Sequence, residues 1–188
     1  MLFRSLSGKT LLVLGTGEIG ARVAQIASQG LRMRVIGVRA HPEKTSPYIE
    51  EMFSPSQLKA ALAEAEAVIM ALPPTEQTLN LIGAAELSAL KPGAFLVNIG
   101  RGASLDEEAL VAAIQDKQVL GAALDVFREE PLPPSSPLWE LPQVLITPHS
   151  AGITPDLWRG VNQIFIENLL RAKRGEPLLN LVDKARGY

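Results

Sequence analysis

The sequence predicts a doubly wound α/β domain, in which helices cover both faces of a parallel sheet. Short apolar runs alternate with longer helical patterns along the chain, and the runs read as continuous apolar stretches. Strands of this kind are buried on both faces and need helices on each side of the sheet. A glycine-rich turn between the first strand and the first helix agrees with this class.

Six strands are expected from the apolar runs. They cover residues 10–15, 33–38, 67–72, 94–100, 120–126 and 144–147. The helical pattern after the first strand covers residues 18–30, and Gly30 is expected to end that helix.

Two later helices begin with capping signals. Ser54 and Gln57 have the spacing of a capping box, with Pro55 at the first helical position. Ser104 and Glu107 have the spacing of a second capping box.

A long helix closes the chain, with Thr154 as its expected cap and Pro155 in its first turn. We therefore expect a dinucleotide-binding domain over residues 1–153. Residues 154–188 form the closing helix and a C-terminal tail.

Composition excludes several classes of function. The formal net charge of −2 gives no electrostatic signature of nucleic-acid or anionic-lipid binding. Without cysteine there is no disulfide framework, thiolate nucleophile or cysteine-ligated zinc, and we expect no metal site. The first apolar run is too short for a signal peptide or a membrane span. We expect a cytoplasmic protein that contacts neither nucleic acid nor membrane.

The stretch LGTGEIG places Gly15, Gly17 and Gly20 between a buried strand and a helix. In this context the first glycine makes the turn, the second lets backbone approach a pyrophosphate, and the third lets the helix pack on the sheet. The amides at the helix start then face the anion. A packing role alone is the alternative, and dinucleotide binding is the preferred interpretation.

The residue after the second strand bears on the choice of dinucleotide. NAD-binding units usually carry an acidic residue there, which binds the ribose 2′-hydroxyl. This sequence has Arg39, with His41 and Lys44 close behind. A guanidinium pairs with a 2′-phosphate, whereas a carboxylate would repel it. We expect NADP(H), with NAD(H) as the second choice; a solvated surface charge is the alternative role for Arg39.

Three further side chains follow expected strands. Arg101 follows the stretch LVNIG, Glu130 lies in the loop after the next strand, and His149 follows the last strand. Ligands of open α/β sheets bind at the carboxyl ends of strands, so these three can meet in one crevice. Taken singly, each has an ordinary structural alternative, and Glu130 beside Glu129 can equally serve loop solvation.

Five motifs together resemble the D-isomer-specific 2-hydroxyacid dehydrogenases, the family of glyoxylate/hydroxypyruvate reductases and D-3-phosphoglycerate dehydrogenases. In chain order they are LGTGEIG, ALPPTEQTLNLIG, LKPGAFLVNIGRG, GAALDVFREEPLP and TPHSAG. They extend over nearly the whole chain. The resemblance implies a Rossmann-type domain and hydride transfer between a nicotinamide dinucleotide and a small 2-keto or 2-hydroxy acid.

The resemblance also implies roles for single residues. Arg101 binds the carboxylate and carbonyl oxygens of the substrate, His149 is the general acid–base, and Glu130 is the partner of that histidine. Histidine has an ordinary pKa of ~6.5, so it can supply a proton near neutrality. A neighbouring carboxylate favours the imidazolium, and the planar arginine side chain matches a carboxylate.

The remaining residues implied by the family are cofactor contacts. Asp125 lies beside the nicotinamide carboxamide in relatives, and a purely structural role is its alternative. The other expected contacts are Thr16, Glu18 and Ile19 in the glycine turn, then Leu72, Pro73, Thr78 and Gly152.

Relatives have a second, substrate-binding domain built mostly from an N-terminal portion that this sequence does not contain. We therefore expect the 188-residue chain to bind NADPH but to reduce glyoxylate or hydroxypyruvate only weakly. The alternatives are a non-catalytic dinucleotide-binding or oligomerisation module, and a half-enzyme completed by a separate substrate-domain chain. We also expect a homodimer that pairs through the Pro-rich loop with Leu138 and Trp139.

Overall fold

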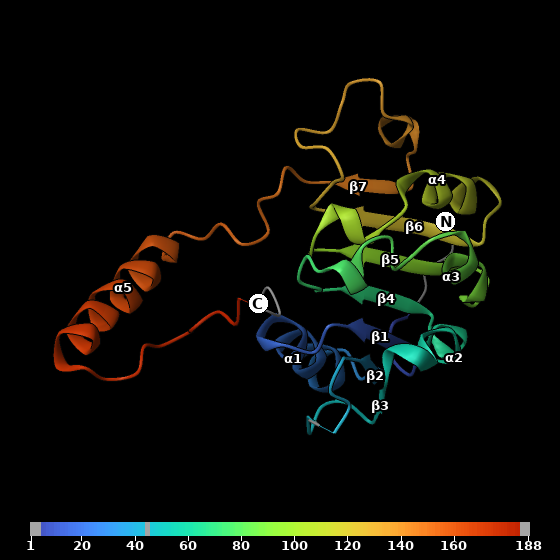
Figure 1. The fold of residues 1–188 in the computed structure, drawn as a ribbon. Coiled ribbons are helices and arrows are strands. Elements are labelled where there is room, and N and C mark those ends of the chain that lie inside the picture. Colours follow the sequence, from blue (N-terminus) through green and yellow to red (C-terminus); the bar gives the residue numbers. More distant parts are fainter. Residues whose placement is uncertain (1–4, 44–45, 185–188) are drawn as a thin grey trace. The chain divides into compact units, whose positions relative to one another are not determined.

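A computed structural model describes residues 5–43 and 46–184 of the chain (Figure 1). These residues form two compact units, which divide between Pro148 and His149. The first unit contains the sheet, and the second contains one long helix, α5. Lys44, which the sequence places near Arg39, lies outside the described residues.

The first unit is built on one parallel sheet, whose strands stand in the order β3-β2-β1-β4-β5-β6-β7 (Figure 1). The strands are β1 (Thr10–Leu14), β2 (Arg34–Val38), β3 (Glu51–Phe53), β4 (Ala67–Met70), β5 (Ala94–Asn98), β6 (Val119–Leu124) and β7 (Val144–Ile146). The order confirms the predicted doubly wound α/β class.

The expected count of six strands was wrong, because β3 adds a seventh. This strand has only three residues and pairs with the end of β2, where Val38 faces Phe53. Its sequence, EMF, gives no continuous apolar run, because only Phe53 is buried. Sheet pairing, and not a local pattern, makes it a strand.

The helices of the first unit are shorter than their sequence patterns suggest. They are α1 (Glu18–Gln25), α2 (Leu58–Glu64), α3 (Ala84–Ala89) and α4 (Glu107–Gln115). A π-helical turn, Ile26–Gly30, continues α1 to the expected glycine. Short 3₁₀ turns cover Pro55–Gln57, Glu76–Thr78, Gly102–Ser104 and Pro137–Glu140. The second unit contains α5 (Leu157–Arg174), which ends at Gly175 in the left-handed conformation.

One of the three expected caps is confirmed. Ser54 and Gln57 form a capping box before α2. Ser104 does not cap α4, because it lies in a 3₁₀ turn and its hydroxyl donates to the carbonyl oxygen of Arg101 at 2.7 Å. Asp106 caps α4 instead and accepts from Ala109 N at 3.0 Å.

Thr154 was also the wrong cap for the closing helix. A turn over the preceding residues delays the helix, so that Asp156 stands at its N-cap position. Pro155 therefore precedes α5 and does not lie in its first turn.

Two hydrophobic clusters form the core of the first unit. The larger includes Leu12, Met70, Leu96 and Leu110, and it lies between the sheet and helices α2 to α4. The smaller lies under α1, around Val13. On the face that α1 covers, β5 and β7 carry Phe95 and Leu145, which are 42% and 64% exposed. Burial of apolar area in these clusters is the main source of stability.

The amino-terminal edge of the sheet carries its own charged network. Glu66 accepts from Thr10 N at 2.7 Å and contacts Lys91 Nζ at 3.2 Å. Burial acts to raise the pKa of Glu66, but these two contacts outweigh it and the pKa is lowered. Arg34 contacts Glu50, Glu51 and Glu64 at 2.8, 3.3 and 2.5 Å.

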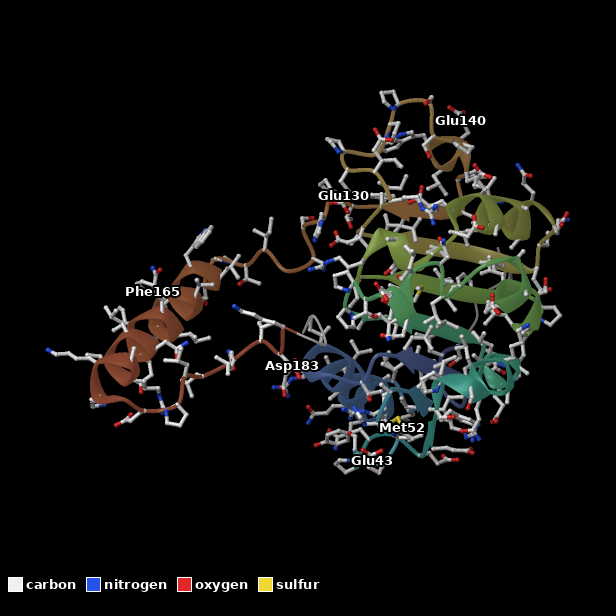
Figure 2. The ribbon with its side chains drawn as sticks, viewed as in Figure 1. Glu43, Met52, Glu130, Glu140, Phe165 and Asp183 are labelled. Carbon is white, nitrogen blue, oxygen red and sulfur yellow. The ribbon has the colours of Figure 1, made fainter. Side chains whose placement is uncertain are left out.

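The second unit has no buried residue among those described from 149 to 184. Apolar side chains of α5 such as Trp158 and Phe165 are exposed, and Figure 2 shows Phe165 projecting from this helix. Within the described part of the chain, no helix combines the length and apolar character needed to cross a membrane.

Candidate active site

The order of the strands reverses between β1 and β4, which are neighbours in the sheet. In open α/β sheets, ligands bind outside the carboxyl ends of the strands at such a reversal point. The turns after β1, β4, β5 and β6 all leave the sheet at this edge. Most of the residues predicted from the sequence lie in these turns.

The glycine-rich turn after β1 contains two kinds of glycine. A Cβ on Gly15 would lie 2.6 Å from Ala71 O, and one on Gly20 would lie 2.0 Å from Gly15 O. Gly15 also has a φ of +87°, a backbone conformation that residues with a Cβ rarely adopt. A Cβ on Gly17, the N-cap of α1, would meet nothing within 4 Å. Packing therefore explains Gly15 and Gly20 but leaves Gly17 unexplained.

The other residues of this turn point in different directions. Thr16 is buried, and its hydroxyl lies 3.9 Å from Met52 Sδ, beside Gly37. Figure 2 shows Met52 in the part of the sheet around β2 and β3. Glu18 and Ile19 begin α1 and are exposed, Ile19 to 62%. An exposed isoleucine at the start of a helix offers an apolar surface beside the amides.

Arg39 reaches from the end of β2 toward the glycine turn. Its Nη1 donates to the carbonyl oxygen of Thr16 at 3.5 Å, and its backbone N–H donates to Phe53 O. The guanidinium is thus near the turn, as the sequence interpretation requires. His41 follows it and lies 3.5 Å from Glu43 through Nδ1.

The segment after β4 is held by Thr78. Its hydroxyl donates to Pro73 O at 2.7 Å, and it accepts from Thr75 N at 2.9 Å. Leu72 precedes this segment, and its Cδ2 would lie 3.1 Å from a Cβ on Gly15. Leu72 therefore borders the glycine turn, whereas Thr78 fixes the backbone at Pro73.

The turn that carries Arg101 is braced by a buried side chain. Asn98 is fully buried; its Nδ2 donates to Arg101 O at 3.0 Å, and its Oδ1 accepts from Gly100 N at 3.1 Å. Arg101 itself is exposed, and its Nη1 donates to Gly100 O at 2.7 Å. A Cβ on Gly102 would lie 1.8 Å from the carbonyl carbon of Phe127, so this turn packs directly on the segment after β6.

The segment after β6 contains two carboxylates at this edge of the sheet. Asp125 is 5% exposed, and its Oδ1 accepts from Thr147 Oγ1 at 2.6 Å. Glu130 is exposed, and its Oε1 accepts from Phe127 N at 2.9 Å; its position is shown in Figure 2. Arg101, Asp125 and Glu130 thus belong to the same edge of one unit.

His149 and Gly152 belong to the second unit. His149 has a φ of +51°, in the left-handed region, which is uncommon for residues other than glycine. Gly152 is exposed, and a Cβ there would meet nothing within 4 Å. Among residues 5–43 and 46–184, no three histidine, aspartate or glutamate side chains are grouped to hold a metal ion.

The structure identifies supporting residues that sequence reasoning missed. They are Asn98, which braces the Arg101 turn, Met52, which lies against Thr16, and Thr147, which donates to Asp125. A polar residue at the end of an apolar strand was the available signal for Asn98. Met52 had none, because the strand β3 was itself missed.

Of the two apolar residues named in the expected dimer contact, the structure contradicts one, Leu138. Leu138 is fully buried in the core of its own chain and cannot contribute to an interface. Trp139 is 51% exposed, and its Nε1 donates to Pro133 O at 3.0 Å.

A family model described as "D-isomer specific 2-hydroxyacid dehydrogenase, NAD binding domain" matches residues 1–151. Glyoxylate/hydroxypyruvate reductase B from Enterobacter agglomerans is 38% identical over 176 residues, which are 93% of this chain and 54% of the relative. The chain thus spans about half the length of the curated relatives it matches.

Two solved structures have the same fold with a TM-score of 0.92. One is a D-isomer specific 2-hydroxyacid dehydrogenase from Xanthobacter autotrophicus in complex with NADPH and MES; it is 38% identical, and the match covers 100% of this chain and 76% of that one. The other is an NADPH-dependent glyoxylate/hydroxypyruvate reductase from Sinorhizobium meliloti in complex with NADP and sulfate. It is 27% identical, and the match covers 100% of this chain and 60% of that one.

Proposed function

This chain belongs to the D-isomer specific 2-hydroxyacid dehydrogenase family and carries its NAD-binding domain, and we propose that it uses NADP(H) to interconvert a small 2-keto acid and its 2-hydroxy acid. Glyoxylate and hydroxypyruvate are the proposed substrates, since relatives bear the name of a reductase of both. The observation that carries the proposal is the open space at Gly17, between two glycines that packing requires.

The glycine turn has the properties that a pyrophosphate site needs. The amides at the start of α1 lack partners within the helix, and the helix dipole favours an anion there. Space above Gly17 lets a phosphate approach those amides. Leu72 and Ile19 border the turn with apolar atoms, which suits the rest of a dinucleotide.

The proposed preference for NADP(H) rests on Arg39. Its guanidinium lies by the glycine turn, and no carboxylate occupies the position at the end of β2 that would bind a ribose 2′-hydroxyl. A 2′-phosphate there would gain a charge-assisted pair with Arg39.

The chemistry is divided between the cofactor and the side chains. The bound nicotinamide supplies the hydride. We assign Arg101 to the carboxylate and carbonyl oxygen of the keto acid, where a planar guanidinium also stabilises developing negative charge. We assign His149 to donate the proton to that oxygen, with Glu130 favouring its protonated form.

Calorimetric titration tests the cofactor assignment. The unmutated protein should bind NADPH more tightly than NADH, and Arg39→Asp should shift the preference toward NADH. Loss of a charged hydrogen-bond partner costs about 1.5–3 kcal/mol, so the affinity for NADPH should fall about 10- to 150-fold. Arg159→Asp is the matched control, because it makes the same charge change on exposed α5. Equal affinities in the unmutated protein would contradict the assignment.

Turnover separates the enzyme from the alternative, a dinucleotide-binding module. Oxidation of NADPH that depends on glyoxylate or hydroxypyruvate and is lost in His149→Ala supports the enzyme. Tight NADPH binding without turnover supports the binding module. For that conclusion, turnover must also stay absent after the protein is mixed with any partner chain that co-purifies with it.

We further propose a cytoplasmic homodimer. The absence of cysteine is consistent with a reducing compartment, and exposed Trp139 offers an apolar contact on the Pro-rich loop. Light scattering at high micromolar concentration measures the oligomeric state, and a monomer there would contradict the dimer.

A further inference from the structure

Thr147 and Asp125 form a side-chain hydrogen bond between the ends of two neighbouring strands. Thr147 follows β7 and Asp125 follows β6; the hydroxyl donates to the carboxylate at 2.6 Å. The backbone holds both residues as well, because Thr147 N donates to Leu124 O and Asp125 N donates to Asn98 O, each at 3.0 Å. The two side chains are therefore fixed by their backbones and by each other.

The bond determines which way a buried carboxylate faces. Asp125 is 5% exposed, and a buried carboxylate needs hydrogen-bond donors to offset its lost hydration. A hydroxyl at 2.6 Å is a short, charge-assisted donor, which restricts rotation of the carboxylate plane. This bond uses one of about four acceptor sites on the two carboxylate oxygens, and it orients the group.

We propose that Thr147 is a positioning residue, which acts through Asp125 to orient the nicotinamide carboxamide of the bound dinucleotide. This inference rests on the proposed function, in which the dinucleotide lies along the carboxyl edge of the sheet. A carboxamide N–H needs an acceptor in a fixed direction, and the bond from Thr147 supplies that direction. The nicotinamide half of the cofactor depends on this pair, whereas the adenosine half depends on the turn after β1.

A comparison of two ligands tests the inference. NADPH contains both halves, whereas 2′-phospho-ADP-ribose lacks the nicotinamide. In Thr147→Val the methyl group replaces the hydroxyl at similar volume, and NADPH affinity should fall about tenfold. Affinity for 2′-phospho-ADP-ribose should stay within about twofold, because that ligand never contacts Asp125. Thr147→Ser keeps the hydroxyl and should restore NADPH binding.

A double-mutant cycle with Asp125→Ala adds a second measurement. If Thr147 acts through Asp125, Thr147→Val should have little further effect on NADPH affinity in the Asp125→Ala background. If Thr147→Val does not fold, Thr147→Ala takes its place, since it removes the hydroxyl without adding a methyl group at that point.

The outcomes separate this inference from the proposed function. The positioning role would be overturned if Thr147→Val lowered the affinity for both ligands equally or lowered neither. It would also be overturned if the effects of the two substitutions on NADPH affinity were additive. In each case the binding of NADPH by the unmutated protein would stand. Failure of the unmutated protein to bind either ligand would overturn the proposed function, and the positioning role with it.

Discussion

The two edges of the sheet differ in how far apart in the sequence their hydrogen-bonded side chains and partners lie. At the amino-terminal edge, Glu66 joins Thr10 and Lys91, which are 56 and 25 residues away, and Arg34 joins Glu64, 30 residues away. These bonds connect separate strands and helices. The amino-terminal edge therefore contributes to how the elements are held together.

At the carboxyl-terminal edge, most of the side-chain bonds stay within one turn. Thr78 reaches Pro73, five residues away, and Asn98 reaches Arg101, three residues away. Such bonds fix the shape of a single turn and the groups that it presents. The exceptions at this edge include Thr147 and Asp125, 22 residues apart, Arg39 and Thr16, 23 residues apart, and Arg128 and Asn80, 48 residues apart. The difference indicates that one edge serves stability and the other serves presentation of the site.

The largest expected effect comes from the closest backbone approach at the carboxyl edge. In Gly102→Ala the new Cβ would lie 1.8 Å from the carbonyl carbon of Phe127, so one of the two turns must move. Overpacking lowers the free energy of unfolding by about 1–3 kcal/mol. We expect a loss at or above the upper end of this range, because backbone atoms cannot move aside easily. Urea denaturation measures the loss in free energy of unfolding.

Gly30→Ala is the control for that substitution, because a Cβ there would meet nothing within 4 Å. It should change the free energy of unfolding by less than about 0.5 kcal/mol. If the two variants were equally stable, tight packing of the Arg101 turn would be contradicted.

A smaller effect is expected from the brace of the Arg101 turn. Asn98→Ala removes bonds to Gly100 N and Arg101 O and opens a small buried space, so we expect a loss of about 2–3 kcal/mol. Ser104→Ala removes one bond to the same carbonyl oxygen and should cost about 1 kcal/mol. Denaturation of both variants checks the ranking, and an Asn98→Ala protein as stable as the unmutated chain would refute the brace.

The smallest effect is expected at the amino-terminal edge, where it depends on pH. The pKa of Glu66 is lowered in the folded protein, so its contribution is present above the ordinary glutamate pKa, ~4.3, and is lost as pH falls through the folded value. Glu66→Gln should therefore destabilise by about 1 kcal/mol at pH 7 and by less at pH 3. Urea denaturation at both pH values measures this.

The pair Lys59–Glu86 gives the control, since its atoms lie 3.7 Å apart and the lysine side chain is 64% exposed. Lys59→Ala should change the free energy of unfolding by at most about 0.5 kcal/mol. The distinction between the two edges would be contradicted if Glu66→Gln changed the free energy of unfolding no more than Lys59→Ala does. It would also be contradicted if the effect of Glu66→Gln did not depend on pH.

Much of the sheet was predictable because buried parallel strands are apolar along their whole length. The positions of β1, β2, β4, β5, β6 and β7 follow from that property, and the glycine turn from its context. Strand β3 was not predictable, since two of its three residues are not buried and its pairing with β2 depends on tertiary structure. The cap at Ser104 failed because a 3₁₀ turn before α4 uses its hydroxyl elsewhere.

The sequence suggests most of the candidate site residues because they lie in the five family motifs, and it suggests Arg39 because that residue follows the second strand. The residues that support them could not be predicted in this way. A sequence shows that Arg101 follows a strand, but not that a buried Asn98 holds its carbonyl oxygen. Nor does spacing reveal that Thr147 faces Asp125, because neighbouring strands in the sheet fix that contact. Such contacts depend on three-dimensional placement.

The left-handed backbone at His149 creates opposite demands on that position. A residue with a Cβ pays about 1–2 kcal/mol for a φ near +51°, whereas glycine pays none and asparagine less than most. Under selection for thermal resistance alone, position 149 would drift to glycine or asparagine and the protein would lose its imidazole. Under selection for reductase activity, the proposed proton donor would hold histidine there against that drift. At position 149 the backbone angle φ favours a residue other than histidine, whereas the proposed activity requires histidine, so stability and activity make opposite demands.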